Sequence, residues 1–276
     1  MNIGIVGLGL MGGSLGLALK KIPSKYHIIG YDHNSKHQKE ALALNLIDEI
    51  TQTFDEIKRC DIIVLTIPVD AIITALQNLT DIPKSCTVID FGSSKAKIDE
   101  SIPHAIRSNV ITAHPMTGTE KFGPTAAIEN LYRDKIMVIC NPEKSGDHQN
   151  KIALDLFAEI HANVVFMDAK EHDRHAAFIS HMPHAVSYAI ANAVMKQEDS
   201  NSIVALAGGG FKSMSRIAKS SPNMWEDIFR QNKENLLKSI ESFNKEMLYC
   251  QELIQEEKWD KLHQWMLKAN SLHDIL

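Results

Sequence analysis

A dense group of ionisable side chains lies between Glu171 and His184, where the sequence reads EHDRHAAFISHMPH. The run holds four histidines in two pairs, with two residues between pair members: His172 and His175, then His181 and His184. Imidazoles at such spacing can ligate zinc, and they can also bind an anion or transfer a proton near neutral pH. The run therefore predicts either a metal centre or a catalytic or binding site.

The second alternative is favoured because the sequence contains no HExxH or comparable ligand signature, so we predict no metal. Lys212 and Arg216 follow three consecutive glycines further along the chain. A guanidinium can hold a carboxylate through two parallel hydrogen bonds. We therefore expect Arg216 and the histidines to bind an anionic small molecule. For Lys212, a solvated surface lysine is an equally good interpretation.

Two further polar residues follow apolar runs that read as strands. Ser93 comes shortly after CTVID (residues 86–90), and His114 directly follows VITA (residues 110–113). In open α/β sheets, ligands bind outside the carboxyl ends of the strands. A histidine at such an end, with its near-neutral pKa, is suited to accept a proton during hydride transfer. Ser93 and His114 are therefore candidate catalytic residues.

The N-terminal sequence predicts a dinucleotide site. A short apolar strand, residues 2–6, leads into Gly7-x-Gly9-x-x-Gly12 and a helix that ends near Lys20. Such a turn brings phosphates to the amino end of the helix. Asp32 ends the second predicted strand and stands where a carboxylate would bind the adenosine ribose, which favours NAD over NADP. The expected cofactor contacts are Gly7, Leu8, Gly9, Leu10, Met11, Gly12, Asp32, Thr66, Pro68 and Ser93.

Alternating strands and helices must position these residues. The predicted strands are residues 2–6, 27–31, 61–67, 86–90, 110–113, 135–140 and 163–167. The continuous apolar run DIIVLTI is typical of a strand covered on both faces, and Pro68 ends it before a helix over residues 69–78. The pattern predicts an α/β fold with a Rossmann-type, doubly wound, mainly parallel sheet.

After Met167 the pattern becomes helical. We predict a long helix over residues 169 to about 198, kinked near Pro183, and another starting at Ser221-Pro222. A last long helix carries a heptad-like apolar stripe, and a shorter one covers residues 258–272. We expect an NAD-binding domain, 1–168, and an all-α substrate-binding and dimerisation domain, 169–276, that forms a homodimer. The stripe consists of Leu236, Ile240, Phe243, Met247, Cys250 and Ile254.

Composition excludes some classes of protein. The 276 residues are 44% hydrophobic and 23% charged, as in a soluble globular protein, and the net charge of −5 argues against a nucleic-acid partner. The four cysteines form no CxxC pair, which indicates reduced thiols. The uncharged segment from Ile3 to Leu19 contains six glycines and no preceding basic region, so a signal peptide is disfavoured. We expect a cytoplasmic protein without a membrane segment.

Four motifs, in order along the chain, resemble the prephenate dehydrogenase family, whose product is the precursor of tyrosine. They are DFGSSK (90–95), HPMTGTEKFGPTAA (114–127), HDRHAAFISHMPH (172–184) and AGGGFKSMSRIAKSSPNMWEDI (207–228). The resemblance covers nearly the whole chain. It implies NAD-dependent oxidation of prephenate to 4-hydroxyphenylpyruvate with loss of CO2.

The resemblance also implies roles for individual residues. His114 matches the catalytic histidine, and Ser93 the serine that hydrogen-bonds both the substrate hydroxyl and that histidine. Arg216 matches the arginine that binds a substrate carboxylate. Other motif positions are expected to line or support the substrate pocket: His181, His184, Gly209, Trp225, Thr119, His172 and Asp173. The chain departs from the family pattern at Thr117, Thr119 and Lys212, which bears on substrate preference.

Three alternatives remain at this stage. An arogenate or dual-specificity cyclohexadienyl dehydrogenase would share every motif, because arogenate carries an amine in place of the keto group. A β-hydroxyacid-type dehydrogenase has a similar glycine turn but relies on a catalytic lysine. An NAD-binding sensor without catalysis is disfavoured by the presence of both Ser93 and His114.

Overall fold

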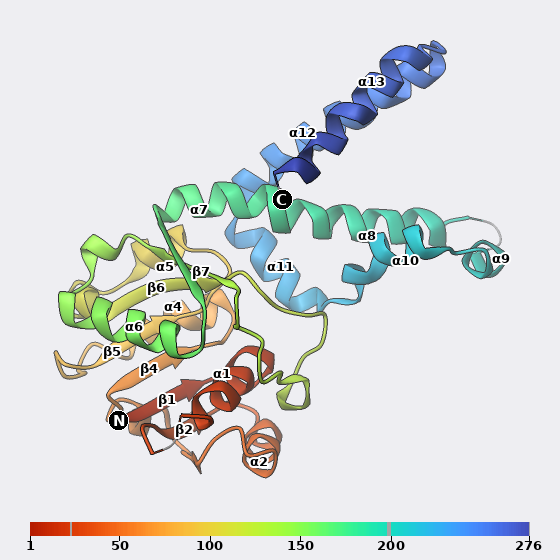
Figure 1. The fold of residues 1–276 in the computed structure, drawn as a ribbon. Coiled ribbons are helices and arrows are strands. Elements are labelled where there is room, and N and C mark those ends of the chain that lie inside the picture. The colour runs from red at the N-terminus through yellow and green to blue at the C-terminus, as the bar shows by residue number, and fades with distance from the viewer. Residues whose placement is uncertain (23, 198–199, 276) are drawn as a thin grey trace. The chain divides into compact units, whose positions relative to one another are not determined.

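The computed structural model describes residues 1–22, 24–197 and 200–275, which form two compact units, Met1–Asn232 and Lys233–Leu276 (Figure 1). None of the helices in these ranges combines the length and the hydropathy that a membrane crossing requires. The first unit contains a large sheet with its covering helices, and the second is built from two helices and a terminal turn.

The sheet has eight strands among the described residues, in the order β3-β2-β1-β4-β5-β6-β7-β8. The first six strands in this order run parallel to one another, β7 is antiparallel to β6, and β8 is parallel to β7. The mainly parallel, doubly wound sheet is thus confirmed. The strands are β1 (Asn2–Val6), β2 (His27–Tyr31), β3 (Glu49–Ile50), β4 (Ile62–Leu65), β5 (Thr87–Asp90), β6 (Val110–Pro115), β7 (Ile136–Cys140) and β8 (Asn163–Met167).

Three strands differ from the sequence prediction by more than one residue. The edge strand β3 was not expected, because two residues, one of them charged, give no recognisable strand pattern. β4 is shorter than the predicted 61–67. β6 is longer than 110–113 and extends through His114 to Pro115, so the histidine belongs to the sheet and pairs with Val138 of β7.

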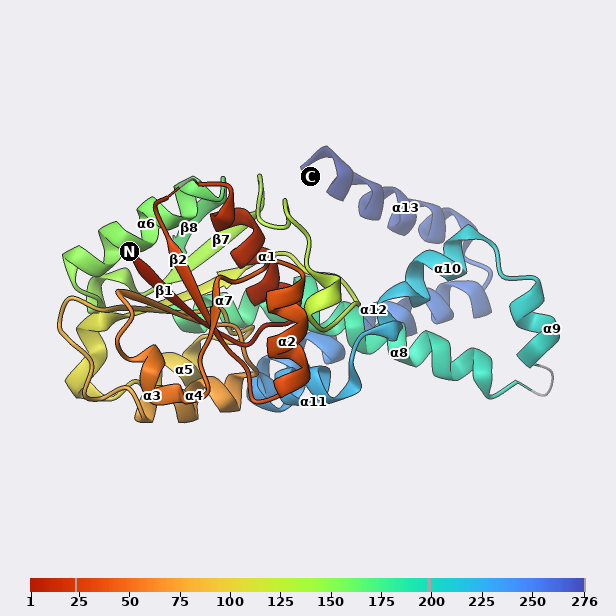
Figure 2. The ribbon, with the colours of Figure 1, turned by 90° about the horizontal axis from the view of Figure 1, so that it is seen from below.

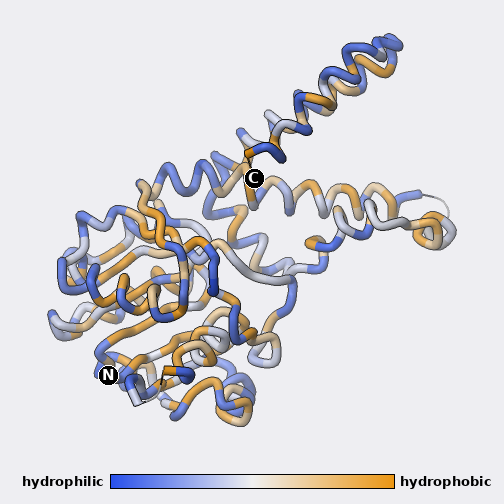
Figure 3. Tube along the Cα trace, viewed as in Figure 1, coloured by the Kyte–Doolittle hydropathy of each residue, from blue (hydrophilic) through white to orange (hydrophobic). Residues whose placement is uncertain are grey.

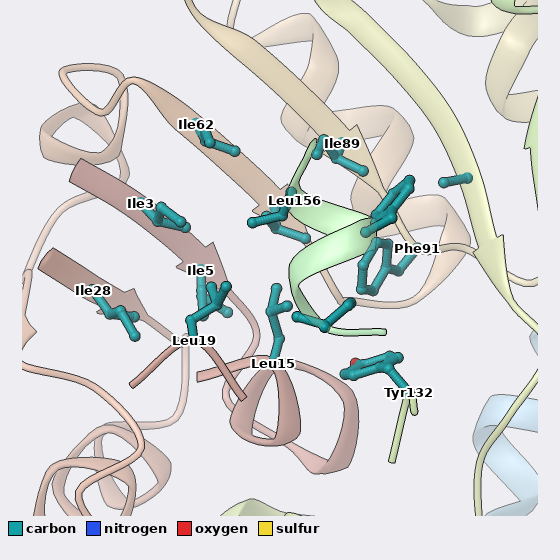
Figure 4. Packing of buried hydrophobic residues seen from close by; sticks show 14 of the residues in the cluster. Ile3, Ile5, Leu15, Leu19, Ile28, Ile62, Ile89, Phe91, Tyr132 and Leu156 are labelled. Carbon is teal, nitrogen blue, oxygen red and sulfur yellow. The ribbon is translucent and has the colours of Figure 1, made fainter. Parts of the chain in front are cut away.

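Helices cover both faces of this sheet (Figure 2). The helices α1, α2 and α6 bury apolar side chains against one face, and α3, α4 and α5 against the other. Figure 4 shows Leu15 and Leu19 of α1 beside Ile3 and Ile5 of β1. The helices are α1 (Leu10–Lys20), α2 (Ser35–Ala43), α3 (Phe54–Ile57), α4 (Val69–Gln77), α5 (Ala96–Ser101) and α6 (Asp147–Glu159), with 3₁₀ turns at His104–Asn109, Pro124–Ala126 and Pro142–Lys144.

The predicted long helix after β8 is interrupted by a wider turn. α7 (Ala169–Ala176) continues through a π-helical turn (Ala177–His181) into α8 (Met182–Met195). The irregularity thus precedes Pro183, which sits in the first turn of α8, where its missing N–H costs little. Residue 198, the predicted end of the helix, lies outside the described ranges. Shorter helices complete the unit: α9 (Ser200–Ala205), α10 (Gly209–Ser215), the 3₁₀ turn Arg216–Lys219 and α11 (Pro222–Gln231).

The second unit consists of α12 (Lys233–Gln255), α13 (Trp259–Asn270) and the 3₁₀ turn Ser271–Asp274. The predicted apolar stripe lies along α12, where hydrophobic and hydrophilic positions alternate (Figure 3). Part of the stripe remains open to solvent: Met247 is 51% and Ile254 49% exposed. Apolar residues left this open on a long helix are typical of an interface with another chain.

Candidate active site

The carboxyl end of β6 carries a line of three hydrogen-bonded side chains. His114 Nδ1 lies 2.8 Å from His172 Nε2, and His172 Nδ1 lies 2.9 Å from Asp173 Oδ1. The first residue comes from the sheet and the other two from α7. His172 and Asp173 are buried, whereas His114 is only partly so. The line therefore leads from the protein interior to a partly accessible imidazole.

Backbone contacts determine the direction of these hydrogen bonds. The Asp173 carboxylate accepts N–H groups from Lys95 at 2.7 Å and Ala96 at 2.9 Å, as expected of an ionised group. A carboxylate can only accept, so His172 Nδ1–H donates to it, and in this tautomer of His172 the other ring nitrogen, Nε2, is an acceptor. His114 Nδ1–H then donates to His172. The remaining nitrogen, His114 Nε2, carries a lone pair and is the potential base.

A buried ion pair lies behind this base. Both Lys95 and Asp90 are fully buried, and the Lys95 ammonium donates to the Asp90 carboxylate and, at 2.6 Å, to the carbonyl of Ala113. Burial, together with the neighbouring His172 and Lys95, holds the pKa of His114 well below its usual range. The imidazole is therefore neutral at pH 7 and able to accept a proton.

An aromatic wall is formed by the second half of the histidine run and α11. The His184 ring stacks on Trp225, with centroids 3.5 Å apart, and His181 meets the same indole edge-on at 6.1 Å. His184 Nδ1–H donates to the Ser180 carbonyl at 2.9 Å, which leaves Nε2 as an acceptor. Burial lowers the pKa of both histidines, that of His181 to about 4. These rings present neutral hydrogen-bonding groups beside an apolar surface.

The predicted anion-binding arginine already has a partner. Arg216 Nη1 lies 3.2 Å from Glu120 Oε2, and the arginine side chain is 59% exposed. Glu120 belongs to the motif HPMTGTEK but was not predicted from the sequence as a site residue. The signal that could have found it is an acidic residue in a motif that begins at the carboxyl end of a strand. An exposed pair of this kind is weak, so an anionic ligand can displace the carboxylate.

Two other predicted substrate residues, Thr119 and Gly209, lie in a loop and at the start of a helix. Thr119 Oγ1 accepts the N–H of Lys121 at 3.2 Å, in the loop that also carries Glu120. Gly209 begins α10, and an added Cβ there would meet no atom within 4 Å.

Ser93 is partly buried after β5, and its hydroxyl has no hydrogen-bond partner among the described residues. The Ser93–His114 bond implied by the family resemblance is therefore not formed in this structure.

Two family descriptions match consecutive parts of the chain. Residues 15–166 match the nucleotide-binding domain of prephenate dehydrogenase, and residues 168–268 match its dimerization domain. The chain belongs to the prephenate dehydrogenase family. The resemblance noted from the four motifs is thus confirmed, and the chain is an oxidoreductase of a family of aromatic amino-acid biosynthesis.

Individual relatives agree with this assignment. The chain is 30% identical over 280 residues to the prephenate dehydrogenase of Bacillus subtilis (strain 168), covering 99% of this chain and 75% of the relative. Prephenate dehydrogenase from A. aeolicus, in complex with hydroxyphenyl propionate and NAD+, has a TM-score of 0.92 at 32% identity, covering 99% and 97%. Synechocystis arogenate dehydrogenase has a TM-score of 0.80 at 28% identity, covering 99% of each chain. Proteins named for either substrate are thus similar to this one.

The nucleotide end of this family member is built as the glycine motif predicts. Gly7 has φ of +94°, which only glycine adopts without strain, and a Cβ on Gly12 would collide with the carbonyl oxygen of Gly7. A Cβ on Gly9 would meet no atom closer than 3.9 Å, so its backbone is open to a phosphate. The Thr66 hydroxyl donates to the Gly7 carbonyl at 2.6 Å and braces the turn. These features fit a dinucleotide at the amino end of α1.

Asp32 is more tightly held than the sequence indicated. Its carboxylate accepts the N–H of Leu8 and the N–H of Asn34, both at 2.9 Å, and it is buried. His33 and His37 place their Nδ1 atoms 3.4 and 3.5 Å from its oxygens. The carboxylate therefore orders the glycine turn as well as standing at the end of β2, where a ribose would bind.

Sequence reasoning underestimated the residues that support the base. We expected His172 and Asp173 to line or support the substrate pocket, whereas in the structure His172 contacts His114 directly and Asp173 contacts His172. Lys95 and Asn232 were not singled out at all. His175, from the same run, lies half exposed beside Glu171. No cluster of three or more potential metal ligands occurs among the residues that the structure describes.

Proposed function

We propose that this chain catalyses the NAD-dependent oxidative decarboxylation of prephenate to 4-hydroxyphenylpyruvate, CO2 and NADH, in tyrosine biosynthesis. The observation that carries the proposal is the hydrogen-bonded line from Asp173 through His172 to His114, which leaves a neutral base at the carboxyl end of β6. Such a base is what the oxidation of a ring alcohol requires.

The residues of the chain would act as follows. His114 Nε2 accepts the proton of the substrate hydroxyl, and the His172–Asp173 pair stabilises the resulting imidazolium through Nδ1–H. Ser93, at the end of the neighbouring strand β5, orients the same hydroxyl. A bound NAD+ would supply the acceptor for the hydride that leaves the hydroxyl-bearing carbon. The ring carboxylate then leaves as CO2 as the ring becomes aromatic, which makes the reaction strongly downhill.

Substrate capture is assigned to the aromatic wall and Arg216. Prephenate is a dianion, so the guanidinium would exchange Glu120 for a substrate carboxylate and form two parallel hydrogen bonds. His181, His184 and Trp225 would line the pocket with neutral donors, acceptors and one apolar face. Thr119 and Gly209 would complete it.

The cofactor is assigned to the glycine turn and Asp32. A dinucleotide would lie along Gly7 to Gly12 and pass the ends of β4 and β5, near Thr66, Pro68 and Ser93. The relative from A. aeolicus was crystallised with NAD+, which supports the same cofactor here. The Asp32 carboxylate disfavours a 2′-phosphate by charge repulsion.

Assembly and domain roles are part of the proposal. The dimerization description matched by residues 168–268, and the half-exposed apolar residues on α12, support a homodimer through the C-terminal helices. We assign cofactor binding to residues 1–168, and substrate binding with dimerisation to residues 169–276.

An arogenate or dual-specificity dehydrogenase is the second candidate. The similarity to Synechocystis arogenate dehydrogenase favours it, and the two substrates differ only at the side-chain keto or amino group. Steady-state rates with both substrates discriminate the two activities. A large preference of kcat/KM for arogenate would reject the first proposal in favour of the second.

The role of the base is tested by His114→Asn. Turnover of prephenate, followed as NADH formation, should fall by about 10²- to 10⁴-fold while the Kd for NAD+ stays nearly unchanged. His175→Asn is the matched control, because His175 is half exposed on α7 and lies beside Glu171. Unchanged turnover in folded His114→Asn protein would exclude His114 as the proton acceptor.

A further inference from the structure

One buried amide connects the two halves of the histidine run. Asn232, the last residue of the first unit, is buried, and its Nδ2 donates to the carbonyl of Asp173 at 2.6 Å. The same nitrogen lies 3.1 Å from Nδ1 of His181. Because a carbonyl only accepts, the atom beside it must be the NH2 group, and its second hydrogen is directed to the histidine.

We propose that Asn232 is a positioning residue for substrate binding, which acts by holding His181 in the tautomer that carries its proton on Nε2. The Asn232 amide donates, so His181 Nδ1 must accept and cannot carry a hydrogen. The ring then offers Nε2–H as a hydrogen-bond donor beside Trp225. This inference rests on the proposed function, in which the pocket holds a dianion.

The tautomer matters because the ring is neutral. His181 is 1% exposed, and burial lowers its pKa to about 4, so it has one donor and one acceptor at pH 7. In the Nε2–H form a donor meets the anionic substrate. In the opposite form a lone pair would face the same negative charge, and binding would weaken.

The position of Asn232 is also suited to separate binding from proton transfer. It touches the backbone of Asp173, not the carboxylate that orients His172, because that carboxylate is held by the N–H groups of Lys95 and Ala96. Removal of the amide should therefore disturb His181 more than the base. This predicts an effect on KM and much less on kcat.

Asn232→Ala should raise KM for prephenate about 5- to 30-fold, as expected for one misoriented buried hydrogen bond to a charged ligand, with kcat within about threefold of wild type. In a His181→Gln background the same change should alter KM by less than about twofold, because the effect runs through His181. Additive effects on KM in this double-mutant cycle would overturn the proposal. Asn130→Ala, at an exposed loop position, is the control for an asparagine loss elsewhere.

The tautomer itself is read from ¹⁵N NMR of the histidine side chains, with the His181 signals assigned by their loss in His181→Gln. Wild-type protein should show an unprotonated Nδ1 and a protonated Nε2. Asn232→Asp should place a proton on Nδ1, because a carboxylate can only accept. A protonated Nδ1 in the wild type would overturn the proposal.

Two measurements separate this inference from the proposed function. The tautomer requires no turnover, and the Kd of hydroxyphenyl propionate in the presence of NAD+ replaces KM if prephenate is not oxidised. If prephenate is not oxidised, but His181 has the expected tautomer and the Asn232→Ala and His181→Gln effects on Kd are not additive, the proposed reaction fails. The role of Asn232 then stands. If folded Asn232→Ala turns over prephenate normally with an unchanged KM, the role of Asn232 fails and the proposed reaction stands.

Discussion

Replacement of His172 tests whether the buried line behind His114 orients the base. His172→Phe keeps an aromatic ring in the buried position but removes the acceptor for His114 Nδ1–H, now held at 2.8 Å. His114 is then able to rotate or to change tautomer, and its Nε2 is no longer held as a base. Asp173 keeps two backbone N–H donors, so its carboxylate is not left unpaired.

The size of the effect follows from the charge that develops during reaction. When His114 takes up the substrate proton, its Nδ1–H becomes the donor of a charge-assisted hydrogen bond, which contributes about 1.5–3 kcal/mol. Its loss in the transition state corresponds to a kcat about 10- to 150-fold lower. KM should change little, because the bond strengthens after the substrate is bound.

The assay is the steady-state rate of NADH formation from prephenate, with circular dichroism and thermal melts to confirm folding. His172→Gln should recover part of the loss, since its amide oxygen can again accept from His114. His175→Phe, on the exposed side of α7, serves as the matched control. The reasoning is refuted if folded His172→Phe keeps kcat within about threefold of wild type. It is also refuted if the glutamine variant is no better than the phenylalanine variant.

The remaining predictions concern pH, substrate capture and cofactor choice. Burial holds the pKa of His114 well below its usual range, and the base acts unprotonated. We therefore expect kcat/KM to stay level as the pH falls to 6.5 and to decrease only at lower pH. A decrease of kcat/KM that begins at or above pH 6.5 would contradict this. Arg216→Ala should raise KM for prephenate. Glu120→Gln should lower KM by at most about fivefold, because this change removes a carboxylate that competes with the substrate. Unchanged KM values in both variants would exclude Arg216 and Glu120 from the site that binds the substrate carboxylate. Asp32→Ala should increase kcat/KM for NADP relative to NAD, and a ratio equal to that of wild type places ribose recognition elsewhere.

The fold could be predicted because its strands are strongly patterned. Apolar runs such as IIVL at residues 62–65 are covered on both faces, and this burial gives a signal that does not depend on the rest of the chain. The reversal of β7 was less visible. Two parallel strands are usually joined by a helix. The segment from Met116 to Lys135 forms only one short 3₁₀ turn. Its lack of a helical pattern was the signal in the sequence that β7 runs antiparallel to β6.

The site was less predictable than the fold, because its contacts join residues far apart in the sequence. Ser93 and His114 were found from a local rule, namely that ligands bind at the carboxyl ends of strands. The contact between His114 and His172 spans 58 positions, and that between Asn232 and Asp173 spans 59. No periodicity encodes such pairs. They follow from the way α7 and α11 pack beside the end of β6.

The π-helical turn explains how one run of histidines can serve two parts of the site. His172 and His181 are nine residues apart, which in a straight α-helix is about two and a half turns, so the two rings would point in opposite directions. A π turn takes more residues per turn, so the rotation between these positions is smaller. His172 can then contact His114 while His181 contacts Trp225 and Asn232. The sequence AFISH itself contains no helix-breaking residue, but Pro183 follows it in a continuous helix and has no N–H for the carbonyl of Ile179. A local cause and these tertiary contacts therefore favour the same turn.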